Sequence, residues 1–251
     1  EFKADRNGIQ RVWMDHGYWP VLTIWQYIQQ TGDIEILLRV APFFQDGLGM
    51  RGTQRDAIQA NRSCTGTVAE HMLLEQLTAF CEAGEHGLLR LRDADWNDAL
   101  DMAPQRGESG AFTSAYAGSM ELLAKMLETL RQTGKCSSID LPKRFEILLG
   151  EEDNWASIAS RREKLDRFCA QCIQIPDDDR IQIPLDKIVR HLDSCADTLK
   201  AIIREKAWIQ TEQDGWFNSY YDNHGIPLEC GVPGQERMML TGQVFAILGG
   251  V

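Results

Sequence analysis

Residues 112–132, FTSAYAGSMELLAKMLETLRQ, decide the fold class of this chain. Their apolar side chains recur at the three- and four-residue spacing of an α-helix, which makes one face continuously hydrophobic. The residues on that face are Tyr116, Met120, Leu123, Met126, Leu127 and Leu130. The pattern predicts a long helix that buries one side in the core.

Further segments on either side carry the same helical periodicity. They cover residues 18–30, 34–44, a stretch between 63 and 84, 155–173, 185–208 and 238–248. Asp33 and Ser63 are predicted caps, because a short polar side chain at a helix start accepts a hydrogen bond from a free backbone amide. Strand signals are limited to residues 88–91 and 180–183. We therefore predict a mainly α chain, and its long loops favour a helical hairpin barrel or a solenoid over a compact bundle.

Composition narrows the possible partners. The 251 residues are 43% hydrophobic and 25% charged, which is typical of a globular chain of one large or two small domains. No apolar run approaches the roughly 20 residues that cross a bilayer, so no membrane span is predicted. The net charge of −11 argues against nucleic acid as a partner, because a phosphate backbone would be repelled.

The seven cysteines predict neither a disulfide framework nor a metal site. Cys169 and Cys172 form a CxxC pair, but a zinc site needs a second pair or nearby histidines. Both lie in a helical pattern in which they are predicted to be core residues. This cysteine usage is typical of the reducing cytoplasm, and we expect no metal and no cofactor.

The stretch with the most chemical information is residues 85–102, EHGLLRLRDADWNDALDM, in which four aspartates and Asn97 surround Trp96. Crowded carboxylates raise the pKa of at least one member, and the indole adds desolvation. A carboxylic acid that stays protonated can act as a general acid. The alternatives are a solvated acidic loop, or Asp98 as the cap of a helix that begins near Ala99. A calcium loop is disfavoured, because its alternating oxygens, glycine and late glutamate are absent.

This stretch resembles a known family. His86-Gly87-Leu88 followed by Asp95-Trp96-Asn97-Asp98 is similar to the HGLPL…DWND segment of the inverting glycoside phosphorylases, which include cellobiose, chitobiose and 1,2-β-oligoglucan phosphorylases and part of the cyclic β-1,2-glucan synthases. Other blocks resemble the family in the same order: DHGYWP and TGD at 15–20 and 31–33, RGES at 106–109, DGWF, YYD and NHG at 214–225, and 237–250. The blocks span almost the whole chain.

The resemblance implies an (α/α)6 barrel, the six-hairpin glycosidase architecture, with the active site in its mouth. It implies transfer of a glucosyl unit to inorganic phosphate with inversion, so that phosphate is a co-substrate and no other cofactor is needed. Asp98 maps to the general acid. Asp95, expected to stay ionised, and Trp96 map to sugar-binding positions. Gln243 maps to a glutamine near the donor sugar.

Other polar residues are candidates on weaker grounds. Asn97, Asp15 and His16 are candidate substrate ligands, although a lone histidine such as His16 or His86 is more often structural. Two aromatic residues beside Asp214, Trp216 and Tyr220, are predicted to form a sugar platform on a loop. Trp19 and Trp25 have the spacing of core residues.

The sequence thus predicts that residues 1–251 are one (α/α)6-type catalytic domain fragment that phosphorolyses β-glucosidic oligosaccharides or synthesises them in reverse. The alternatives are a transglycosylase or hydrolase on the same scaffold, or a non-catalytic carbohydrate-binding fragment. Fewer helices are predicted than the twelve of the family barrel, and the family's β-sandwich domain has no counterpart. We expect the partner of the chain to be the remainder of a longer polypeptide or a second copy, with the phosphate ligands outside these residues.

Overall fold

The structure of the protein is a computed structural model that describes residues 13–43, 65–92, 95–97, 103–150, 157–174, 179–229, 234 and 236–251. Asp98, the predicted general acid, lies outside the described residues, as does the predicted cap Ser63. Within the described part, no helix combines the length and the apolar character needed to cross a membrane.

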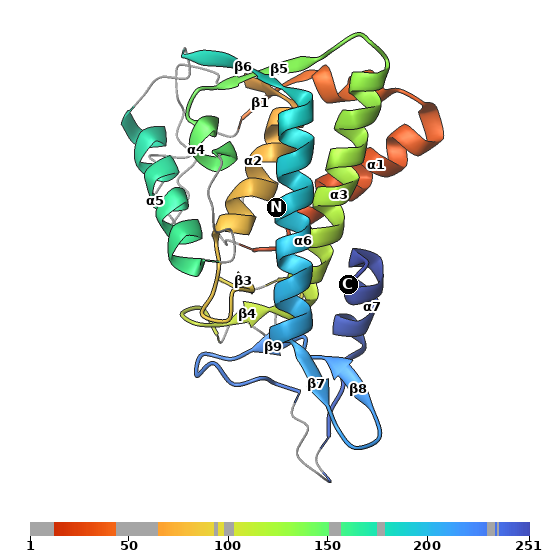
Figure 1. Cartoon of the computed structure of the whole chain (residues 1–251), viewed down its shortest axis with the longest axis vertical. Coiled ribbons are helices and arrows are strands. Elements are labelled where there is room, and N and C mark those ends of the chain that lie inside the picture. Colours follow the sequence, from red (N-terminus) through yellow and green to blue (C-terminus); the bar gives the residue numbers. More distant parts are fainter. Residues whose placement is uncertain are drawn as a thin grey trace, which may run out of the picture.

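Two long helices form the centre of the molecule. Helix α3 (Gly110–Gln132) runs beside α6 (Leu185–Lys206), and these two helices share the largest helix–helix contact (Figure 1). Helix α3 is buried on every side over its first half, from Gly110 to Met120, because other elements pack around it. The apolar periodicity of residues 112–132 therefore marks the core of the fold.

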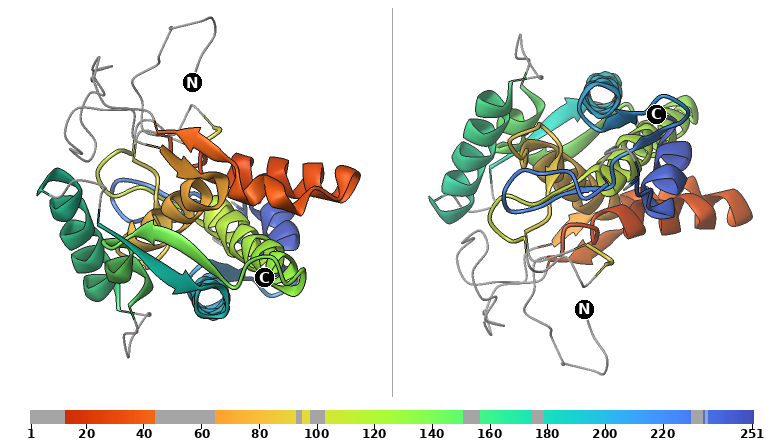
Figure 2. Two further views of the ribbon diagram at one scale, coloured as in Figure 1. Left: turned by 90° about the horizontal axis from the view of Figure 1, so that it is seen from above. Right: turned by 90° about the horizontal axis from the view of Figure 1, so that it is seen from below.

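The other helices surround this pair. Helices α1 (Tyr18–Thr31) and α7 (Leu240–Gly249) pack on α3, and α2 (Val68–Cys81) contacts α1, α3 and α5 (Ile158–Gln174). The short helix α4 (Phe145–Leu149) packs on α5. Seen end-on, α5 lies on one side and α1 and α7 lie on the other, with α2 and α3 between them (Figure 2).

Short antiparallel strands occupy both ends of the helical body. The strands β5 (Ser138–Pro142) and β6 (Arg180–Pro184) pair at one end. At the other end, β3 (Leu89–Arg90), β4 (Glu108–Ser109) and β9 (Tyr220–Tyr221) form a three-stranded sheet, and β7 (Trp208–Gln210) pairs with β8 (Gly215–Phe217) (Figure 1). A further pair, β1 (Val40–Pro42) and β2 (Thr65–Thr67), precedes α2.

The mainly α prediction is confirmed, and several boundaries need correction. An α-helix was predicted over residues 34–44, but residues 34–42 form a 3₁₀-helix η1 (Ile34–Leu38) followed by β1. Asp33 does not cap it, because its carboxylate accepts hydrogen bonds from the Tyr27 hydroxyl at 2.9 Å and from Arg39 at 2.8 Å. The cap of α2 is Thr67, whose Oγ1 accepts a hydrogen bond from the Glu70 amide at 3.1 Å.

Four predicted burial states also differ from the structure. Cys172 is exposed on α5 and Trp19 is 38% exposed on α1, so both core predictions are wrong. Trp216 lies in β8 and Tyr220 lies in β9, and both are buried, whereas the two were predicted to form a sugar platform on a loop. The helices are compatible with the helical barrel that the resemblance implies, and closure into an (α/α)6 barrel stays a prediction.

Candidate active site

The sheet β3–β4–β9 brings together three of the sequence blocks that carry the resemblance. Ser109 of the RGES block pairs with Leu89 on one side and with Tyr220 on the other. Residues paired across antiparallel strands share a face, and successive residues alternate between faces. Ser109 and Tyr220 therefore lie on one face of the sheet, and Glu108 and Tyr221 lie on the opposite face.

Asp95 is the buried centre of the first face. Its exposed fraction is 0%. Its Oδ1 accepts a hydrogen bond from the Asn97 amide at 2.9 Å, and its Oδ2 accepts one from the Ser109 hydroxyl at 3.0 Å. Burial raises the pKa of Asp95 from 3.8 to about 6, although both hydrogen bonds act in the opposite direction. A carboxyl with this pKa is mostly ionised at neutral pH and takes up a proton in mild acid.

Two more buried groups lie near the Asp95 carboxylate. Asp15, which is 4% exposed, accepts a hydrogen bond from Trp19 Nε1 at 2.7 Å, and its negative charge adds to the rise in the pKa of Asp95. The Tyr220 hydroxyl makes no hydrogen bond of ordinary geometry to a described residue. It still lies close enough to the Asp95 carboxylate to lower the pKa of that group. Burial, and then the charge of Asp95, raises the pKa of Tyr220. The structure thus brings Asp15, predicted as a ligand, close to Asp95.

Trp96 is the accessible member of the cluster. Its side chain is 56% exposed, although its neighbour Asp95 is fully buried. Asn97 is partly buried, and its backbone amide closes the turn onto Asp95. An exposed indole beside hydrogen-bonding groups is an arrangement that suits stacking on a sugar ring.

The opposite face of the sheet carries the pair Glu108 and His86, whose contact was not predicted from the sequence. Glu108 is fully buried and accepts hydrogen bonds from the His86 amide at 3.1 Å and from His86 Nδ1. The His86 ring stacks on Tyr221 with a centroid distance of 3.9 Å. Burial raises the pKa of Glu108, and His86 opposes the rise. A Cβ at Gly84 would collide with the Glu108 side chain, so this close approach requires a glycine. The requirement becomes visible only in the structure.

The remaining predicted ligands make contacts to other residues. The His16 ring contacts the Trp13 ring edge-on at 5.3 Å between centroids. The Gln243 amide accepts a hydrogen bond from the Phe217 amide at 3.0 Å and donates to the Phe217 carbonyl at 2.8 Å, which ties α7 to β8. Trp216 is buried and Gln243 is partly exposed, and the roles of both in sugar binding stay predictions.

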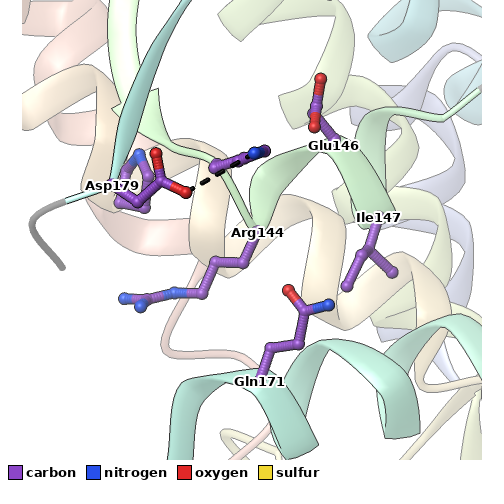
Figure 3. Close-up of a pocket in the computed structure, with 7 residues that line it drawn as sticks. Arg144, Glu146, Ile147, Gln171 and Asp179 are labelled. Carbon is purple, nitrogen blue, oxygen red and sulfur yellow. Dashed lines mark ion pairs between the residues drawn. The ribbon is translucent and has the colours of Figure 1, made fainter. Parts of the chain in front are cut away.

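A cavity of about 210 Å³ lies at the other end of the molecule, between the end of β5, α4 and α5 (Figure 3). Its rim carries a Lys143–Asp179 ion pair at 3.6 Å, with Arg144 and Gln171 beside it. None of the sequence blocks reaches it. Among the described residues, no group of three or more histidines, cysteines and carboxylates is placed to hold a metal ion.

Comparison with known proteins identifies the family. Residues 2–135 match the catalytic domain of the Glycosyl hydrolase 94 superfamily. The match covers more than half of the chain, and the chain belongs to this superfamily.

Two curated phosphorylases are similar to parts of the chain. Solabiose phosphorylase of Paenibacillus borealis is 30% identical over 90 residues, which are 36% of this chain and 10% of that protein. The 3-O-beta-D-glucopyranosyl-beta-D-glucuronide phosphorylase of the same organism is 28% identical over 132 residues, which are 52% of this chain and 15% of that protein. The matches thus span a small part of either relative.

Proposed function

We propose that the chain carries the sugar-binding and acid-catalytic part of an inverting glycoside phosphorylase that acts on β-glucosidic oligosaccharides. Membership of the superfamily and the two phosphorylase relatives support this proposal. The observation that carries it is the turn that contains Trp96. In this turn the Trp96 indole is exposed, while the adjacent Asp95 is fully buried and hydrogen-bonded.

In this proposal Asp98, the residue after Asn97, is the general acid. It donates a proton to the glycosidic oxygen while a phosphate oxygen attacks the anomeric carbon from the opposite side. The bond from that carbon to the glycosidic oxygen breaks, the bond to phosphate forms, and the configuration changes from β to α. An inverting hydrolase needs a second carboxylate to activate water, but phosphate is already an anion and needs no such base.

The surroundings of Asp95 bear on where the phosphate sits. Asp15 and Glu229 are buried near this cluster, and the described residues form no ion pair with Asp15, Asp95 or Glu229. Such a negative region accommodates sugar hydroxyls and repels a phosphate dianion. We therefore place the sugar on the Trp96 side and the phosphate ligands outside this cluster.

The test is turnover of β-linked glucose disaccharides with and without inorganic phosphate, followed by phosphorus NMR. A phosphorylase forms a sugar 1-phosphate only when phosphate is present. Release of free glucose at the same rate without phosphate would instead establish a hydrolase, and transfer between sugars without phosphate would establish a transglycosylase. Asp98→Asn is the matched control, since it keeps the shape of the side chain and removes the acid.

A further inference from the structure

Both oxygens of the Asp95 carboxylate accept hydrogen bonds from other residues of the chain. One oxygen accepts the Asn97 amide and the other accepts the Ser109 hydroxyl, and no part of the residue is exposed. A residue that binds the sugar directly would have to present an oxygen toward solvent. The geometry of Asp95 is that of an anchor inside a tight turn, in which an aspartate oxygen holds the amide two residues ahead.

Ser109 connects this turn to the buried start of α3. Its Oγ accepts a hydrogen bond from the Phe112 amide at 3.0 Å, which caps α3, and donates one to Asp95 at 3.0 Å. Ser109 is fully buried and is held in register between Leu89 and Tyr220. The α3 cap and the sheet register therefore fix the position of the hydroxyl that holds Asp95.

We propose that Asp95 and Ser109 are positioning residues that lock the turn carrying Trp96 onto the start of α3, and that Trp96, not Asp95, touches the sugar. The first half of the proposal concerns the chain alone, and the second half rests on the proposed function. An aspartate suits the lock because an ionised carboxylate accepts several hydrogen bonds at once and makes stronger ones than a neutral acceptor.

The lock also accounts for why so costly a group is buried here. Among the described residues, the charged and titratable side chains that act on the pKa of Asp95 are Asp15 from the segment before α1 and Tyr220 from β9. Neither supplies a positive charge, so the carboxylate is retained against an electrostatic penalty. A residue that binds the sugar directly would not need to be buried in this way.

The first experiment follows the position of Trp96 by fluorine NMR of the chain labelled with fluorotryptophan, with the resonance assigned through Trp96→Phe. Ser109→Ala removes the lock and the α3 cap together. Thr67→Ala is the matched control, because Thr67 caps α2 through an equivalent bond to the Glu70 amide and does not touch Asp95. We expect Ser109→Ala to shift or broaden the Trp96 resonance, and Thr67→Ala to leave it unchanged.

Two further variants keep this test decisive. Asp95→Ala breaks the lock from the other side without removing a helix cap, and it should change the Trp96 resonance as Ser109→Ala does. Ser109→Thr keeps the hydroxyl and should restore the wild-type resonance. An unchanged Trp96 resonance in both Ser109→Ala and Asp95→Ala would overturn the lock, as would an equal change in Thr67→Ala.

The second experiment measures the binding of cellobiose, laminaribiose and sophorose through the same resonance. Asp95→Asn keeps the oxygen that holds the Asn97 amide, and its Nδ2 can donate to Ser109 Oγ in place of the bond that Oδ2 accepts. We therefore expect the affinity of this variant to equal that of the wild type. If Asp95 touched the sugar, loss of a hydrogen bond to a charged group would weaken binding by about tenfold to a hundredfold. Absence of binding by every disaccharide would overturn the proposed function and the role of Trp96 in it, while the first experiment still decides the lock.

Discussion

Replacing Asp95 with asparagine is expected to make the folded chain more stable at neutral pH. Burial raises the pKa of Asp95 from 3.8 to about 6, a difference of about two units. Each unit corresponds to about 1.4 kcal/mol, so the ionised carboxylate costs the fold up to about 3 kcal/mol above that pKa. Asparagine has the same shape without the charge and keeps an oxygen for the Asn97 amide. We expect the free energy of unfolding to rise by about 1–3 kcal/mol.

The effect has a defined pH window. The folded chain binds the Asp95 proton at a higher pH than the unfolded chain does, because its pKa is raised. The stability that Asp95 contributes is therefore fully present below pH 3.8 and is lost as the pH rises through about 6. The difference in unfolding free energy between Asp95→Asn and the wild type should be small in acid, grow across this window and then level off.

The assay is urea unfolding of both proteins at neutral pH and at a pH near 3.8. Asp222→Asn is the matched control, because Asp222 closes the same kind of turn onto the His224 amide at 2.8 Å in a more exposed place. It should show no gain. An Asp95→Asn protein that is less stable than wild type at neutral pH, or a difference that is equal at both pH values, would show that the buried charge of Asp95 does not destabilise the fold.

Three more changes have expected outcomes. Asp98→Asn should lower turnover by about 10² to 10⁴ while steady-state sugar affinity persists, and near-normal turnover would leave Asp98 as a helix cap only. Arg161→Met should lower the unfolding free energy by about 2–5 kcal/mol in urea titrations, because fully buried Arg161 bonds the Phe80 carbonyl and lies 4.3 Å from the centre of its ring. Gly118→Ala should cost about 1–3 kcal/mol in thermal unfolding, since its Cβ would lie 2.8 Å from Gly249 Cα where α7 crosses α3, and an unchanged melting temperature would contradict this packing.

The long helices could be predicted from the sequence because each carries several turns of apolar periodicity. Helix α3 lies at Gly110–Gln132 against the predicted 112–132, and α6 lies at Leu185–Lys206 against 185–208. The prediction of an α-helix from Ile34 onward was wrong, because the four apolar residues at 34 and 36–38 fit an α-helix and a 3₁₀-helix equally well. Strands of two or three residues such as β4 and β9 carry no pattern of their own, because their pairing partners are distant in sequence.

Residues of the candidate site could be predicted from the sequence, but the hydrogen bonds and strand pairing that join them could not. The DWND stretch directed attention to Asp95 and Trp96, and the structure places them as buried anchor and exposed ring. Ser109 was named only as part of a motif, because its bond to Asp95 depends on the register of β4 beside β9. Trp216 was misplaced for the same reason, since pairing of β8 with β7 turned an expected loop into a buried strand.

Inverting phosphorolysis is tested most directly by the anomeric configuration of the first product. Proton NMR of a β-linked glucose disaccharide incubated with the protein in phosphate buffer distinguishes the sugar phosphates from free glucose as they form. The account predicts α-glucose 1-phosphate as the first product, with none formed by Asp98→Asn on the same time scale. β-Glucose 1-phosphate, or free glucose as the first product, would contradict it.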